Sequence, residues 1–69
     1  MKDFKNKLKK LRKQHKLTQK QVAQKLNVSY QSYQAYEMGK AFPTLPHFIM
    51  LANIFEVSLE FLIGKNDWK

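Results

Sequence analysis

Apolar residues recur along this chain with the period of an α-helix, and no segment of four or more residues alternates as a strand does. In residues 3–15, Phe4, Leu8 and Leu11 fall at i, i+4 and i+7, and lysines occupy the other faces. The spacing predicts an amphipathic helix with Asp3 as its N-cap, because its apolar residues form a single stripe. The absence of alternation predicts a fold without a sheet.

Two shorter helices, joined by a tight turn, are predicted for residues 18–26 and 29–37. Thr18 and Gln21 have the spacing of a capping box, in which each side chain bonds the backbone amide of the other. Asn27 is expected to end the first of these helices, because asparagine tolerates a positive φ. The side chains expected to point into the core are Val22, Ala23, Leu26, Tyr33 and Tyr36.

Phe42 and Pro43 interrupt the helical pattern, and two further helices are predicted after them, at residues 44–55 and 58–63. Pro46 falls in the first turn of the former, where its missing N–H costs no intrahelical bond. The expected N-caps are Thr44 and Ser58. The apolar face of the longer helix is expected to consist of Leu45, Phe48, Leu51, Ala52 and Phe55. The pattern thus predicts one all-α domain of five helices over residues 1–69.

Composition fits one small domain. Hydrophobic residues make up 43% of the 69 residues and aromatic residues 13%, which is enough apolar material to fold. A core of this size is marginal, so it needs efficient helix packing or a partner subunit. The chain has no cysteine, and His15 and His47 have no companions at metal-ligand spacing. No metal site and no cofactor are therefore expected.

The net charge of +8 is concentrated in the first part of the chain. Residues 1–25 carry nine lysines and one arginine against one aspartate, whereas residues 26–69 carry three lysines and four acids. A segregated positive region indicates a polyanionic partner, with nucleic acid first and an anionic membrane second. A lysine face that only aids solubility is the alternative.

Other classes of function have less support. No apolar run approaches the roughly 20 residues that span a membrane, and no signal peptide is visible, so a cytoplasmic protein is expected. A basic amphipathic membrane binder is disfavoured because the apolar stripe of the first helix is narrow and needed by the core. No catalytic triad, phosphate-binding glycine loop or carboxylate pair is evident, so neither an enzyme nor a small-molecule binder is predicted.

Short motifs follow one another in a characteristic order. They are Leu8-x-x-Leu11-Arg12, Leu17-Thr18-Gln19, Val22-Ala23, Val28-Ser29, Tyr36-Glu37-x-Gly39, Pro43-Thr44-Leu45, Leu51-Ala52 and Val57-Ser58-Leu59. In this order and spacing the chain, over residues 4–64, resembles the Cro/repressor-type helix-turn-helix family, also called the xenobiotic-response-element (XRE) family. The resemblance implies a compact five-helix, lambda-repressor-like DNA-binding domain. Its helix-turn-helix motif would occupy residues 18–37, with the second helix of the motif in the DNA major groove.

Two positions depart from the family pattern. Lys16 stands where the family usually has glycine, and Glu56 where it often has glycine or asparagine. If either residue is left-handed, that conformation costs about 1–2 kcal/mol.

The resemblance assigns DNA contacts to one surface of the motif and the turn after it. Gln19 would anchor a phosphate, and Gln31 is the best candidate for reading a base, since glutamine can bond N6 and N7 of adenine. Tyr30 would reach a thymine methyl or a phosphate, Ala35 can make only apolar contact, and Gln34 would face the DNA backbone. The alternative is that these are ordinary solvated helix residues. The complete set is Thr18, Gln19, Ser29, Tyr30, Gln31, Ser32, Gln34, Ala35 and Lys40.

Arg12 and Glu37 match a family pair that forms a salt bridge between the first helix and the end of the third. Arg12 carries the only guanidinium of the chain, which suits a bidentate partner that lysine could not replace. Glu37 is therefore interpreted as structural and not catalytic.

A homodimer is expected, because dimers of this family bind half-sites about one helical turn, roughly 34 Å, apart on pseudo-palindromic DNA. Apolar residues that fall off the predicted core face are candidates for the dimer interface. They are Met50, Ile54, Phe61, Ile63 and Trp68. The leading hypothesis is a sequence-specific double-stranded DNA-binding regulator, a repressor of the phage or mobile-element type that occludes a promoter. The alternative is an antitoxin or protein-interaction module in which DNA binding is secondary.

Overall fold

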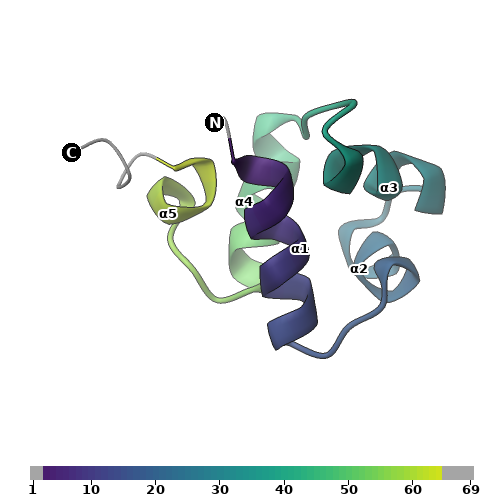
Figure 1. The fold of residues 1–69 in the computed structure, drawn as a ribbon, viewed down its shortest axis with the longest axis horizontal. Helices are drawn as coiled ribbons and strands as arrows, with labels where there is room; N and C mark the ends of the chain where they lie inside the picture. Colours follow the sequence, from purple (N-terminus) through teal and green to yellow (C-terminus); the bar gives the residue numbers. More distant parts are fainter. Residues whose placement is uncertain (1–2, 65–69) are drawn as a thin grey trace.

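Five α-helices and no strand make up residues 3–64, the part of the chain that the computed structural model describes. In chain order the helices are α1 (Phe4–Gln14), α2 (Gln19–Leu26), α3 (Tyr30–Met38), α4 (Leu45–Ile54) and α5 (Leu59–Ile63). In Figure 1, α1 runs through the middle of the molecule, with α2 and α3 to one side and α5 to the other. The helix α1 contacts both α3 and α5, and α4 contacts both α2 and α5. The predicted all-α, lambda-repressor-like fold is confirmed.

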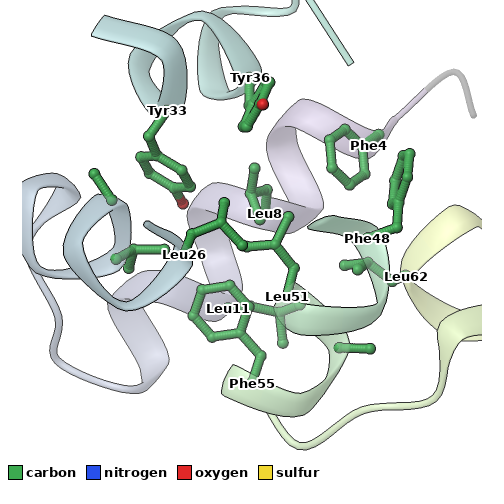
Figure 2. Close-up of a cluster of buried hydrophobic side chains, with 13 residues drawn as sticks. Phe4, Leu8, Leu11, Leu26, Tyr33, Tyr36, Phe48, Leu51, Phe55 and Leu62 are labelled. Carbon is green, nitrogen blue, oxygen red and sulfur yellow. The ribbon is translucent and has the colours of Figure 1, made fainter. Parts of the chain in front are cut away.

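The core forms where the apolar stripes of the helices meet. Leu8, Leu26 and Leu51 are completely buried, and Figure 2 shows Tyr33 and Tyr36 reaching toward Leu8 from α3. The two tyrosines are therefore core residues, as predicted. The buried hydrophobic residues are Phe4, Leu8, Leu11, Val22, Ala23, Leu26, Tyr33, Tyr36, Phe48, Leu51, Ala52, Phe55 and Leu62.

The prediction for the face of α4 was wrong in part. Leu45 was placed in the core but is 62% exposed, whereas Met50 and Ile54 were placed outside and pack, partly buried, against the core. Ile63 of α5 behaves in the same way. The reason is that α4 is apolar around most of its circumference, so its residue pattern does not define one inward stripe. Contacts with α2 and α5 decide which residues are covered.

Each of the five helices has a polar N-cap residue, but only three of these residues make a side-chain cap bond, namely Thr18, Ser29 and Ser58. The Thr18 hydroxyl accepts from the Gln21 amide at 3.1 Å while the Gln21 side chain accepts from the Thr18 amide at 2.8 Å, so the predicted capping box is confirmed. Asp3 and Thr44 stand at the N-caps of α1 and α4 but make no side-chain cap bond. The Asp3 carboxylate accepts instead from the Asn6 side chain at 2.8 Å.

Three helix ends share one local design. Lys16, Asn27 and Glu56 are left-handed, with φ of 58°, 62° and 57°. Each is followed by an apolar residue whose amide bonds the carbonyl five positions earlier, at 3.0–3.1 Å, which is the Schellman arrangement. A serine or threonine N-cap comes next and starts the following helix. Lys16 and Glu56 thus adopt the strained conformation, at positions where the family usually has glycine and often has glycine or asparagine, respectively.

Replacing Glu56 by glycine is expected to raise the free energy of unfolding by about 0.5–1 kcal/mol. Glycine relieves a left-handed strain of about 1–2 kcal/mol but gives part of it back through the greater entropy of the unfolded chain. The midpoint of urea unfolding reports the change. Asn27→Gly is the matched control and should change stability less, because asparagine already tolerates this conformation. If the Glu56→Gly variant is no more stable than the parent, the inference that the left-handed backbone at Glu56 is strained is wrong.

Candidate nucleic-acid interface

The N-terminal ends of α2 and α3 lie together and carry most of the side chains assigned to DNA contact. The pair α2 and α3 has the most extensive helix-to-helix contact in the molecule. On α3, Gln31 and Ser32 are exposed, while Tyr30 and Gln34 are half-buried. Thr18 and Ser29 serve as N-caps, so part of their hydrogen-bonding capacity is used within the protein. The exposed side chains at the first turn of α3 are neutral and can donate or accept hydrogen bonds, as side chains that read base edges do.

Tyr30 connects the two helices at this surface. Its hydroxyl donates to Gln19 Oε1 at 3.4 Å and accepts from Gln34 Nε2 at 3.2 Å. The ammonium nitrogen of Lys20 lies 5.5 Å from the centre of the Tyr30 ring, a cation–π arrangement. This network was not predicted from the sequence. The i, i+4 spacing of Tyr30 and Gln34 on α3 was the signal that could have indicated half of it.

Open depressions flank Tyr30 on the surface. One, of about 370 Å³, is lined by Arg12, Leu17, Thr18, Gln19, Lys20 and Tyr30. The other, of about 300 Å³, is lined by Lys20, Gln21, Ala23, Gln24, Val28 and Tyr30. Lys20 and Tyr30 line both depressions.

A buried ion pair lies directly beneath this surface. Arg12 Nε lies 2.6 Å from Glu37 Oε2, and a second Arg12 nitrogen donates to Oε1 at 3.2 Å, so the contact is bidentate. Arg12 also donates to the carbonyl of Leu17 at 3.0 Å, which fixes the turn before α2. The side chain of Glu37 is only 1% exposed. The ion pair that the family resemblance implies is thus present.

Glu37 receives further hydrogen bonds besides those from Arg12. The Tyr33 hydroxyl donates to Oε2 at 2.5 Å, and Gln19 Nε2 donates to Oε1 at 2.9 Å. One carboxylate therefore ties together α1, α2 and α3. The bond from Gln19 also connects this buried charge to the surface network of Tyr30.

These contacts shift the ionisation of the buried groups. Burial alone would raise the pKa of Glu37, but hydrogen bonds from Arg12, Tyr33 and Gln19 outweigh it, so that its pKa lies below the ordinary 4.5. The hydrogen bond to Glu37 raises the pKa of Arg12. Burial, followed by the hydrogen bond to Glu37, raises the pKa of the Tyr33 hydroxyl far above its usual range. At neutral pH the cluster is therefore an ionised pair with a protonated tyrosine donor.

The stability of the protein is expected to fall in acid because of Glu37. Its folded pKa is below its unfolded value, so its contribution is complete above about pH 4.5 and is lost as the pH falls through the lower folded value. The free energy of unfolding, measured in urea between pH 6 and pH 2.5, should therefore decline below about pH 4.5. A Glu37→Gln variant should show a shallower decline, and an equally steep one would contradict the assignment to Glu37.

Lysines of the basic region lie close to α3 at two places. Lys20 lies beside Tyr30, as described. At the other end of α3, the Lys5 side chain passes so close to Gly39 that a Cβ there would lie 2.9 Å from Lys5 Cδ. Gly39 is also left-handed, with φ of 76°, and is followed by the exposed Lys40. Lys5, which the sequence analysis did not single out, therefore joins Lys40 near the end of α3.

The residues predicted for a dimer interface are spread over different environments. Phe61 is 38% exposed, with the Lys7 ammonium 4.5 Å from its ring centre and 2.8 Å from its carbonyl oxygen. Met50, Ile54 and Ile63 are partly covered by the core of the same chain, and Trp68 lies outside the described residues. Large apolar side chains that are more exposed than Phe61 are Met38, Phe42, Leu45 and Ile49. None of these four residues was predicted to lie in an interface.

Other chemistry finds little support in residues 3–64. Within this range no group of three histidine, cysteine or acidic side chains could hold a metal ion, and no helix is long and apolar enough to cross a membrane. The His15 ring stacks edge-on against Phe55, with ring centres 5.4 Å apart, and its Nδ1 lies 3.0 Å from the Leu11 carbonyl oxygen. His15, the C-cap of α1, thus packs against Phe55, the C-cap of α4.

Five helices in this order, with α2 and α3 joined by a left-handed turn and a neutral polar surface on α3, define a helix-turn-helix protein of the lambda-repressor-like class. The chain belongs to the helix-turn-helix family of the Cro/repressor (XRE) type. A family model described as helix-turn-helix matches residues 8–62, which include all the residues of the buried ion-pair cluster.

Proteins named as transcriptional regulators resemble the chain over most of its length. It is 45% identical over 67 residues to the HTH-type transcriptional regulator YqaE of Bacillus subtilis, which covers 96% of this chain and 58% of that protein. It is 38% identical over 60 residues to YobD of the same organism, covering 87% and 54%. It is 35% identical over 48 residues to RstR, the cryptic phage CTXphi transcriptional repressor of Vibrio cholerae, covering 70% and 43%. The chain thus spans about half the length of these curated relatives. No solved structure matches it.

Proposed function

We propose that this chain is a sequence-specific double-stranded DNA-binding transcriptional repressor that places α3 in the major groove. The observation that supports this proposal most directly is the first turn of α3, where the exposed side chains are neutral and can form hydrogen bonds. Lysines lie near both ends of this helix. A major groove about 12 Å wide admits such a helix. Lys5, Lys20 and Lys40 would contact phosphates, which fix position, while Gln31 and its neighbours would read bases.

The proposed molecule acts in the cytoplasm as a homodimer on a pseudo-palindromic operator and represses by occluding a promoter. One recognition helix reads only a few base pairs, so two copies supply the needed specificity. The name of RstR as a phage transcriptional repressor supports this direction of control. The test is a selection of bound duplexes from a random library at physiological salt, together with sedimentation of the free protein. A palindromic motif and a dimer are expected, and binding without sequence preference would refute the proposal.

Replacing Gln31 by alanine is expected to weaken binding to the selected operator by about five- to 150-fold. The estimate follows from the loss of one bidentate base contact, about 1–3 kcal/mol. The preference for one base over the others should weaken at one base pair of each half-site. The dependence of log affinity on log salt should stay unchanged, because no phosphate contact is lost. Titration of labelled duplexes at several salt concentrations measures both. Gln14→Ala, an exposed glutamine at the end of α1, is the matched control and should bind like the parent.

A protein-interaction module remains the second candidate, and the exposed apolar side chains favour it specifically. Met38, Phe42, Leu45 and Ile49 are each more than 45% exposed. Exposed apolar surface of this kind marks protein contacts when its members adjoin. Purification of the protein from its native cells would show a stoichiometric heterologous partner if this module, such as an antitoxin, is the main function.

A further inference from the structure

The charge of Glu37 fixes which way the side chain of Gln19 faces. An ionised carboxylate can only accept hydrogen bonds, so the group 2.9 Å from Glu37 Oε1 must be the amide nitrogen of Gln19. The amide oxygen of Gln19 then faces the opposite way, and it lies 3.4 Å from the Tyr30 hydroxyl. The orientation follows from charge, because the reversed amide would place two acceptors against each other.

The same reasoning carries the direction outward to Gln34. The Gln19 oxygen carries no proton, so the Tyr30 hydroxyl is the donor in the hydrogen bond between them. The Tyr30 oxygen can then only accept, and it accepts from Gln34 Nε2 at 3.2 Å. The Gln34 oxygen is therefore turned away from Tyr30, and it has no hydrogen-bond partner within residues 3–64. A chain of hydrogen bonds with one fixed direction, here called the polarised chain, thus runs from the buried Glu37 carboxylate through Gln19 and Tyr30 to Gln34.

We propose that this polarised chain makes Tyr30 and Gln34 an acceptor pair that reads an exocyclic amino group in the major groove. The inference rests on the proposed function. Only adenine N6 and cytosine N4 offer donors at the edge of that groove, whereas guanine and thymine present acceptor oxygens there. Guanine O6 or thymine O4 placed opposite the Gln34 oxygen would face its lone pairs and be disfavoured at that point. The remaining N–H of Gln34 can also donate to N7, which favours adenine over cytosine.

Glu37 is then a positioning residue for base recognition as well as a structural one. Without a fixed charge at its inner end, a row of amides and a hydroxyl could reverse every bond and present a donor instead. With Glu37 ionised, only one direction satisfies each group. The preference for an amino group is thus set by a residue that is itself 1% exposed and out of reach of DNA.

The test uses the full chain and its selected operator. At each A·T pair the adenine is replaced by purine, which lacks the amino group, and at each C·G pair the cytosine is replaced by 2-pyrimidinone. Affinity is measured for the parent, Tyr30→Phe, Gln34→Ala and Gln31→Ala, each first shown to melt like the parent. At one position of each half-site the parent should lose about fivefold when the amino group is removed, the size of one hydrogen bond. Tyr30→Phe and Gln34→Ala should lose that sensitivity, and Gln31→Ala should keep it.

The outcomes separate the two proposals. If no sequence is selected, the proposed function itself fails. If a sequence is selected but no amino group matters, or if the sensitivity disappears in Gln31→Ala and persists in Gln34→Ala, the function stands and the inference is overturned. A loss of affinity when the amino group of an adenine is removed supports the form in which Gln34 bonds both N6 and N7. A loss when the amino group of a cytosine is removed supports recognition through the amino group alone.

Discussion

Replacing Glu37 by alanine is expected to lower the free energy of unfolding by about 3 kcal/mol or more, a typical cost of removing one partner from a buried ion pair. The variant leaves the Arg12 guanidinium, the Tyr33 hydroxyl and the Gln19 amide without their common acceptor. A domain of this size has a total stability of only about 3–10 kcal/mol, so a large fraction of the variant should be unfolded at 37 °C. Urea unfolding monitored by circular dichroism measures the loss.

Two further variants show whether the ion pair is the cause. Glu60→Ala removes an exposed glutamate from α5 and should change stability by less than about 0.5 kcal/mol. The double variant Arg12→Met with Glu37→Met should lose less than the sum of the two single variants, because no buried charge is then left unpaired. If the stability losses of the Arg12→Met and Glu37→Met variants add up fully in the double variant, the pair does not stabilise the fold. The same follows if Glu37→Ala is as stable as Glu60→Ala.

Replacing Leu51 by alanine is expected to cost about 2–5 kcal/mol, the range for emptying a buried leucine site. Leu51 is 0% exposed and lies in α4, which packs against both α2 and α5. The lost contacts and the cavity would therefore loosen the support of the helix-turn-helix unit as well as the core. Thermal unfolding should show a melting temperature lower by more than about 10 °C, since 1 kcal/mol shifts a domain of this size by about 4–8 °C.

Leu45→Ala is the matched control, since it makes the same substitution in the same helix at a residue that is 62% exposed. It should alter stability by less than about 0.5 kcal/mol. Comparable losses for the two variants would mean that the packing of α4 is not as described.

Residues that lie close along the chain were largely predictable. The capping box of Thr18 and Gln21, the left-handed Asn27 and the inward Phe4, Leu8 and Leu11 follow from spacings of a few residues. Such features depend on backbone geometry and local hydrogen bonds, which the sequence specifies directly. Asp3 and Thr44 show the limit, because residue type predicts a cap but not which bond its side chain makes.

Features that depend on contacts between helices were not predictable from spacing. Leu45 and Met50 exchanged their expected environments because α4 is apolar on most sides, so its neighbours determine which residues are covered. The pairing of Arg12 with Glu37 was expected only through the family resemblance.

The sequence by itself determined five helices, a basic region and a neutral first turn on α3, since each depends on residue order within a few turns. Only the tertiary structure decided how the polar side chains of that surface face. Gln19 and Glu37 are 18 residues apart and belong to different helices, yet the bond between them fixes the amide of Gln19, and through Tyr30 that of Gln34. The physical reason is that a hydrogen bond has a direction, and the direction here is set by a charge that folding buries.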